Sequence, residues 1–158
     1  MTTIYEAIEK DHAHHRDLLN RLAETSGDSE ERRSLWNEFY YDVKSHAAAE
    51  EETFYSKLIA QPMGQDPARH SVHEHQQLDD IMEELNDMDM SSSGWLTRFR
   101  TLKHDYEHHM DEEEDEIFSK AREVIEKDDD PAIAKAFASR KKAEMKLVDQ
   151  KAADSLED

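Results

Sequence analysis

Apolar side chains recur along this chain at steps of three and four residues, and charged residues fill most of the positions between them. This period is that of the α-helix, in which residues three and four apart share one face. Segments rich in Gly, Pro, Ser or Asp separate the stripes at 27–29, 61–67, 91–94 and 128–131. We therefore predict four long amphipathic helices and a fifth, weaker one near the C-terminus, whose thin apolar stripe is Ile133, Phe137 and Val148.

Two predicted helix starts carry capping signals. Thr3 and Glu6 have the spacing of a capping box, which predicts that the first helix begins near Ile4. Asp66 followed by Pro67 predicts the start of the third helix, because an acidic cap and a proline at the first helical position are both favoured.

Polar side chains of metal-ligand type occupy core-facing steps of all four stripes. They are His12, His15, His46, Glu50, His75, His109 and Glu113. Burying an uncompensated carboxylate costs several kcal/mol, so such a group takes a partner or a proton. A metal cation would remove this cost for Glu50 and Glu113. The alternative is a buried polar network without metal. The other histidines lie off the stripes and are predicted to face solvent: His14, His70, His73, His104 and His108.

The ligand-type residues belong to an internal repeat. The segment 46–51 reads His-Ala-Ala-Ala-Glu-Glu, and the segment 109–114 reads His-Met-Asp-Glu-Glu-Glu. An acid-histidine pair precedes each segment by about 34 residues, Asp11-His12 and Glu74-His75. Two related helix pairs would place four helices around one inner site. We therefore expect a four-helix bundle over residues 1–127, followed by a C-terminal helix and tail over residues 128–158.

The ligand chemistry follows from the residue types. The chain has no cysteine, so any metal must bind nitrogen and oxygen ligands. Imidazole with carboxylate suits iron, manganese or zinc, whereas calcium and magnesium prefer oxygen alone. Two carboxylates facing each other with histidines on both sides fit a pair of ions bridged by Glu50 and Glu113.

The composition of the chain excludes several other classes of function. The 158 residues carry a formal net charge of −19, which argues against binding nucleic acid or anionic membranes. The first residues show no apolar signal-peptide segment, and no apolar run has the length of a membrane span. We expect a cytoplasmic protein, and the oligomeric state stays open.

The doubled Asp/Glu-His and His-x-x-x-Glu-Glu pattern, spanning roughly residues 4–125, resembles the hemerythrin-like family, also called the HHE cation-binding domain. The resemblance implies an all-α, up-down-up-down four-helix bundle with a non-haem diiron centre. In that centre histidines and two bridging carboxylates hold the irons, and an oxo or hydroxo bridge is expected between them. The positions that match are His12, His46, Glu50, His75, His109 and Glu113.

The chain departs from the animal hemerythrins at two places. They have a further histidine four residues before the one that matches His75, where this chain has Ser71. They also bridge the irons with an aspartate five residues after the last histidine, where this chain has Glu113 at four and Glu114 at five. A ferritin-like site is the competing interpretation, but its Glu-x-x-His motif occurs here once, at Glu9 and His12.

Three functions are compatible with such a centre. The first is reversible binding of dioxygen at an open iron position, for oxygen storage, delivery or sensing. The second is an enzyme that acts on hydrogen peroxide or nitric oxide, for which Tyr106, one turn before His109, is the candidate proton donor beside the cofactor. The third is iron storage or sensing, favoured by the acidic composition.

His15 breaks the repeat, because Leu78 occupies the matching position in the second half. We predict that His15 is a fifth histidine ligand, which gives the first helix pair three imidazoles. The open position would then lie on the iron held by His75 and His109, near Tyr106 and Leu78. Asp79, four residues after His75, could fill that position instead.

Overall fold

The computed structural model describes residues 2–157 of the backbone and the side chains of residues 2–147. Its long helices are α1 (Ile4–Ala23), α2 (Glu30–Glu50), α4 (Gln65–Asp87), α5 (Ser93–Glu112) and α7 (Asp130–Glu157). Two short helices, α3 (Ser56–Ile59) and α6 (Phe118–Val124), extend α2 and α5. Short 3₁₀ turns lie at Pro62–Gly64 and Lys127–Asp129. The described part of the chain contains no β-strand.

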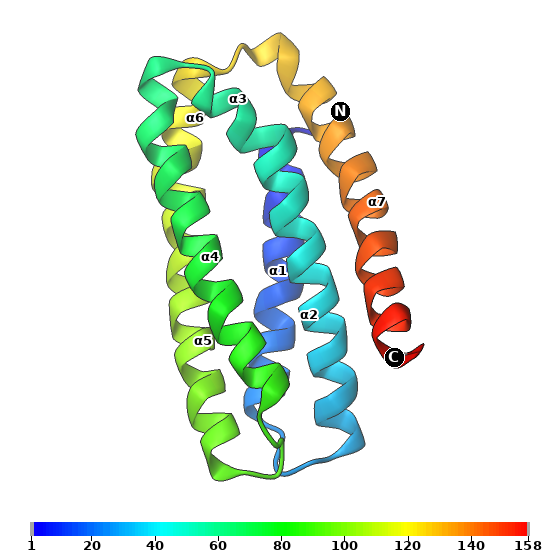
Figure 1. Cartoon of the computed structure of the whole chain (residues 1–158). Helices are drawn as coiled ribbons and strands as arrows, with labels where there is room; N and C mark the ends of the chain where they lie inside the picture. The colour runs from blue at the N-terminus through cyan, green and yellow to red at the C-terminus, as the bar shows by residue number, and fades with distance from the viewer. Residues whose placement is uncertain (1, 158) are drawn as a thin grey trace.

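The four helices α1, α2, α4 and α5 run alternately up and down around a common axis (Figure 1). This arrangement confirms the predicted up-down-up-down bundle. The additional C-terminal helix is confirmed as well, and α7 lies along the outer side of the bundle against α1 and α2. No helix within the described residues is both long and apolar enough to cross a membrane.

Two π-helical turns interrupt the long helices at equivalent places. One covers Glu51–Tyr55 between α2 and α3, and the other covers Glu113–Ile117 between α5 and α6. A π turn inserts one extra residue into the helix and often marks a functional site. The apolar period did not predict these turns, one of which begins directly after Glu50 and the other at Glu113.

The helix starts agree only partly with the capping signals. Thr3 forms the predicted capping box, since its Oγ1 accepts from the Glu6 amide at 3.1 Å and Glu6 accepts from the Thr3 amide. The prediction for Asp66 is wrong, because α4 begins at Gln65 after Gly64. A Cβ at Gly64 would lie 2.3 Å from the Leu58 carbonyl oxygen. The close approach of α3 to this turn therefore sets the start of α4.

The apolar core consists of two clusters separated along the bundle axis. One cluster lies toward the loops that join α1 to α2 and α4 to α5, and it includes Leu22, Trp36, Trp95 and Phe99. The other lies toward α3 and α6 and includes Ile8, Phe54, Phe118 and Phe137. The predicted ligand residues lie in the layer between them, so apolar side chains exclude water from that layer on both sides.

Helix α7 closes the side of the bundle that is formed by α1 and α2. The carboxylate of Asp130 accepts from the Ile4 amide at 2.7 Å, and Ile133, Ala134 and Phe137 join the second apolar cluster. The Phe137 ring lies 5.5 Å from the His46 ring, measured between centroids. The side chain of Val148, the last member of the predicted stripe, lies outside the described residues.

Replacing Phe137 with alanine tests the docking of α7. Phe137 is 3% exposed, and removing a buried aromatic ring costs about 3–5 kcal/mol. We expect Phe137→Ala to lower the free energy of unfolding by an amount in that range, measured by chemical denaturation followed by circular dichroism. Leu147→Ala is the matched control on the same helix, since Leu147 is 47% exposed and should change stability little. Equal stability of both variants would show that α7 is not docked as described.

Candidate metal centre

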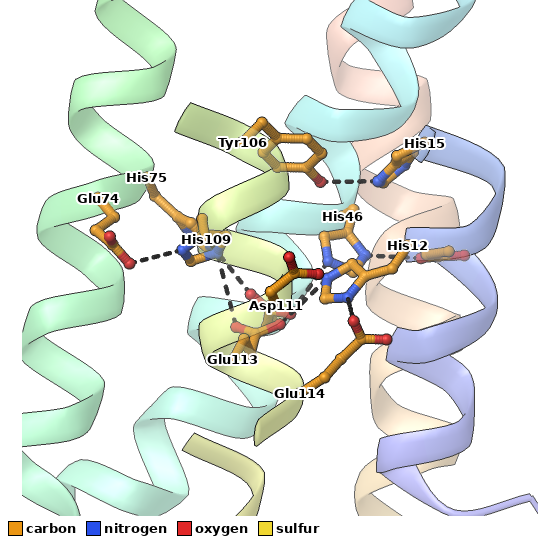
Figure 2. A network of polar contacts seen from close by, with 12 residues as sticks. His12, His15, His46, Glu74, His75, Tyr106, His109, Asp111, Glu113 and Glu114 are labelled. Carbon is orange, nitrogen blue, oxygen red and sulfur yellow. Dashed lines mark hydrogen bonds and ion pairs between the residues drawn. The ribbon is translucent and has the colours of Figure 1, made fainter. Parts of the chain in front are cut away.

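Six side chains from the four bundle helices and the π turn that extends α5 converge in the layer between the apolar clusters (Figure 2). His12 comes from α1, His46 and Glu50 from α2, His75 from α4, His109 from α5 and Glu113 from the π turn that follows it. They form two overlapping groups of possible metal ligands, His12-His46-Glu50-Glu113 and Glu50-His75-His109-Glu113. All six are buried. The geometry therefore offers two cation positions that share both carboxylates.

Each shared carboxylate directs one oxygen toward each histidine pair. Glu50 Oε2 lies 3.1 Å from His46 Nε2, and its Oε1 lies 3.1 Å from His75 Nε2. Glu113 Oε1 lies 3.2 Å from His12 Nε2, and its Oε2 lies 3.8 Å from His109 Nε2. Two carboxylates whose two oxygens point to different histidine pairs are arranged to bridge two cations.

The hydrogen bonding of these atoms is incomplete. Within the described residues, no hydrogen bond reaches His46 Nε2, either oxygen of Glu50, or Glu113 Oε1. Both ring nitrogens of His12 also lack one. Buried polar atoms are normally paired, and an unpaired one costs about 1–3 kcal/mol. A set of unpaired nitrogen and oxygen lone pairs facing a common centre fits a bound cation of the iron, manganese or zinc type.

Carboxylates on the outside of the centre orient the imidazoles. His46 Nδ1 donates to Asp11 at 2.8 Å, and His109 Nδ1 donates to Glu74 at 2.9 Å. Glu51 lies 3.4 Å from His75 Nδ1, and Glu114 lies 3.8 Å from His12 Nδ1. An acid at Nδ1 leaves the Nε2 lone pair free for a metal. The sequence repeat contained all four acids, but it did not indicate that Asp11 and Glu74 contact the histidine of the neighbouring helix.

The ionisation of the two carboxylates differs when no cation is present. Burial and the charge of Glu50 raise the pKa of Glu113 well above its ordinary value. Burial would also raise the pKa of Glu50, but His46 and His75 lower it well below the usual range. Burial lowers the pKa values of these two histidines, yet the nearby carboxylates raise both to about 9. The empty centre therefore holds protons in place of cations.

The structure places His15 outside both groups. Its Nε2 donates to Asp42 at 2.5 Å, and its Nδ1 accepts from the Tyr106 hydroxyl at 2.8 Å (Figure 2). Because both ring nitrogens have protein partners, this geometry does not support His15 as a fifth ligand. Burial lowers the pKa of His15 to about 4, so the ring is neutral near pH 7. His15, which replaces the leucine of the second half, instead holds Tyr106 by a hydrogen bond. The Tyr106 ring stacks on the His109 ring with 6.1 Å between centroids.

A pocket of about 370 Å³ between α2 and α4 leads from the surface to this layer. Its lining includes His46, His75 and Tyr106 at the inner end and apolar side chains such as Leu78 and Met82 along the walls. Asp79 lines the pocket but pairs with Lys44 at 2.5 Å and is 45% exposed, so it does not join the ligand groups.

One residue that contacts the centre was missed from the sequence. The hydroxyl of Tyr55, which is fully buried, donates to Glu113 Oε2. In the sequence Tyr55 belongs to an apolar pair, Phe54-Tyr55, that follows the first His-x-x-x-Glu segment, and the matching residue in the second half is Phe118. The one signal in the sequence was that a tyrosine, and not a second phenylalanine, occupies this position of the first half. The π turn that carries Tyr55 could not be predicted from the spacing of the apolar residues.

Comparison with known proteins agrees with this geometry. The family model of the hemerythrin HHE cation binding domain matches residues 3–121. The chain belongs to this family. An uncharacterized hemerythrin-like protein of Schizosaccharomyces pombe is 24% identical over 144 residues, which cover 90% of this chain and 70% of that protein.

A solved structure shows the same fold. The crystal structure of a hemerythrin HHE cation binding domain-containing protein from Mycobacterium kansasii superposes with a TM-score of 0.86 and 24% identity. The match covers 96% of this chain and 92% of that protein, so it extends beyond the residues that the family model matches. Family membership and the buried histidine-glutamate groups together show an HHE domain built to bind metal cations.

Proton release tests the ionisation of the empty HHE centre. At pH 7 the pKa values of about 9 leave His46 and His75 protonated, and Glu113 holds a further proton. A cation must displace these protons, so its affinity should rise with pH from pH 7 through the histidine pKa values of about 9. Calorimetry of Zn²⁺ binding to metal-free protein at pH 7, in buffers that differ in protonation enthalpy, should show proton release. Identical heats in all buffers would contradict the assignment.

Proposed function

We propose that this protein holds a non-haem pair of iron ions, bridged by Glu50 and Glu113. His12 and His46 would complete one position, and His75 and His109 the other. The observation that carries this proposal is that each carboxylate directs one oxygen toward each histidine pair. The donor set of imidazole and carboxylate without sulfur suits iron, and an oxo or hydroxo bridge would complete the pair.

Dioxygen is the ligand that the surroundings favour. The pocket between α2 and α4 is mostly apolar, and it reaches one histidine of each pair, His46 and His75. The pair of irons would supply the electrons and the coordination position for a small ligand. The protein would admit the ligand, keep water away through the apolar walls, and present the Tyr106 ring beside it. Since His15 is held by Asp42 and Tyr106, each iron position has two imidazoles, and pocket access decides where the ligand arrives.

A specific contact chain favours a second candidate, an enzyme that acts on hydrogen peroxide or nitric oxide. Reduction of either substrate consumes protons. Asp42, whose side chain is 14% exposed, hydrogen-bonds His15, and His15 accepts from the Tyr106 hydroxyl at the pocket wall. These hydrogen bonds run outward from the Tyr106 hydroxyl, so the chain fixes the orientation of that hydroxyl and holds its proton at the pocket wall, where a bound substrate could take it. A simple carrier needs no proton donor at this place.

Iron content tests the centre itself. Protein reconstituted with Fe²⁺ without oxygen should hold about two irons per chain. Glu50→Gln and Glu113→Gln should each lose most of this iron, because each removes a shared charged ligand. Glu116→Gln is the matched control, since Glu116 is exposed on the same π turn as Glu113. Elemental analysis that finds a single zinc, or equal iron in all three variants, would contradict the diiron proposal.

Reaction with dioxygen and peroxide separates carrier from enzyme. A carrier should develop an absorption band in air that disappears under argon over repeated cycles. An enzyme should oxidise irreversibly in air and turn over hydrogen peroxide. For the enzyme, His15→Leu should lower turnover at least tenfold without loss of iron, because leucine is the residue at the matching position 78 and cannot hold Tyr106. Unchanged turnover in His15→Leu would exclude a role for the contact that positions the Tyr106 hydroxyl, and Tyr106→Phe tests the proton of that hydroxyl separately.

A further inference from the structure

A second histidine-glutamate cluster lies on the outer face of α4 and α5. Each helix carries one His-x-x-x-Glu pair there, His70 with Glu74 on α4 and His108 with Glu112 on α5. Residues four apart lie on one side of a helix, so the two pairs face each other across the helix contact. The four side chains thus repeat, at the surface, the spacing of the buried ligands.

The distances bring three of these side chains to one point. His70 Nε2 lies 2.8 Å from Glu112 Oε1 and 3.5 Å from Glu74 Oε1. The three donor atoms fall within the separation expected of ligands to one cation, and His108 Nε2 lies 3.4 Å from the other Glu112 oxygen. His70 is half exposed, whereas the two carboxylates are mostly covered. A cation could therefore enter from solvent and find two oxygens already in place.

The surroundings favour a positive ion. A surface groove beside His70 and Glu112 is lined by further acids, Asp66, Asp115 and Glu116. The chain as a whole carries a net charge of −19. Lys120 is the lysine among the lining residues, and the acids outnumber it. A mainly negative groove raises the local concentration of positive counter-ions.

We propose that His70, Glu74 and Glu112 form a surface site for a divalent transition-metal ion, with His108 beside it. One imidazole with two carboxylates is a ligand set for zinc or iron(II), and water would fill the remaining positions. None of its three ligands belongs to the two ligand groups of the buried centre.

Glu74 connects the surface site with the buried one. Its Oε1 accepts from His109 Nδ1 at 2.9 Å and also faces His70. A cation on this oxygen would compete with His109 for it. Occupation of the surface site should therefore change how firmly His109 is oriented toward the buried centre.

Zinc uptake at equilibrium tests the site. The protein as purified is dialysed against Zn²⁺, and elemental analysis gives zinc and iron per chain. Wild-type protein should take up one zinc per chain more than His70→Ala, and Glu112→Gln should show the same loss. His73→Ala is the matched control, because His73 is exposed on the same helix but is not part of the cluster, and it should bind as much zinc as wild type.

The result is read as a difference between variants, so it stands whether the buried centre holds two ions, one or none. Equal zinc in wild type, His70→Ala and Glu112→Gln would overturn the proposal. So would the same loss in His73→Ala, since it would show that the effect is not local. Circular dichroism checks that each variant is folded, and the exposure of His70 makes its replacement mild.

Discussion

Two carboxylates and four imidazoles share a buried layer at the centre of a helical bundle, and the rest of the structure depends on their charge. Glu50 and Glu113 are fully buried and belong to both ligand groups. Ligand atoms of the two carboxylates lie within 4.8 Å of each other. Two buried carboxylates this close cannot both stay ionised without a positive charge beside them, and the empty site compensates with protons on Glu113 and on two histidines. The apolar clusters on both sides keep water from screening these charges, so a bound cation is the most effective compensation.

The ligands follow the internal repeat, but the surroundings do not. Matching residues in the two halves are 63 positions apart, as with His46 and His109, and they occupy equivalent places around the centre. His15 and Tyr55 have no polar counterpart, and α7 covers only the side of α1 and α2. Lys141 of α7 contacts Asp11 and Asp42, the acids that hold His46 and His15. In the second half Glu74, which matches Asp11, faces His70 of the surface cluster instead. The two cation positions therefore have equal ligands and different environments.

The bundle and the six converging residues could be predicted from the sequence. The bundle follows from the helical spacing of the apolar residues, and the six residues follow from the internal repeat of ligand-type side chains. Polar side chains such as Glu50 on an apolar stripe have few explanations, and a cation is the simplest. The contact of Tyr55 with Glu113 and the start of α4 at Gln65 could not be predicted, because the former depends on a π turn and the latter on the close approach of Gly64 to its neighbour. The sequence correctly predicted that His15 points into the bundle. Which atoms its ring nitrogens contact depends on the positions of Asp42 and Tyr106, which the sequence does not give.

The most direct test of the central claim is a crystal structure of the iron-loaded protein with anomalous diffraction recorded on both sides of the iron absorption edge. Two iron peaks should appear between Glu50 and Glu113, one beside His12 and His46 and the other beside His75 and His109. A single peak, or metal held without both glutamates, would contradict the claim that these carboxylates bridge a pair of ions.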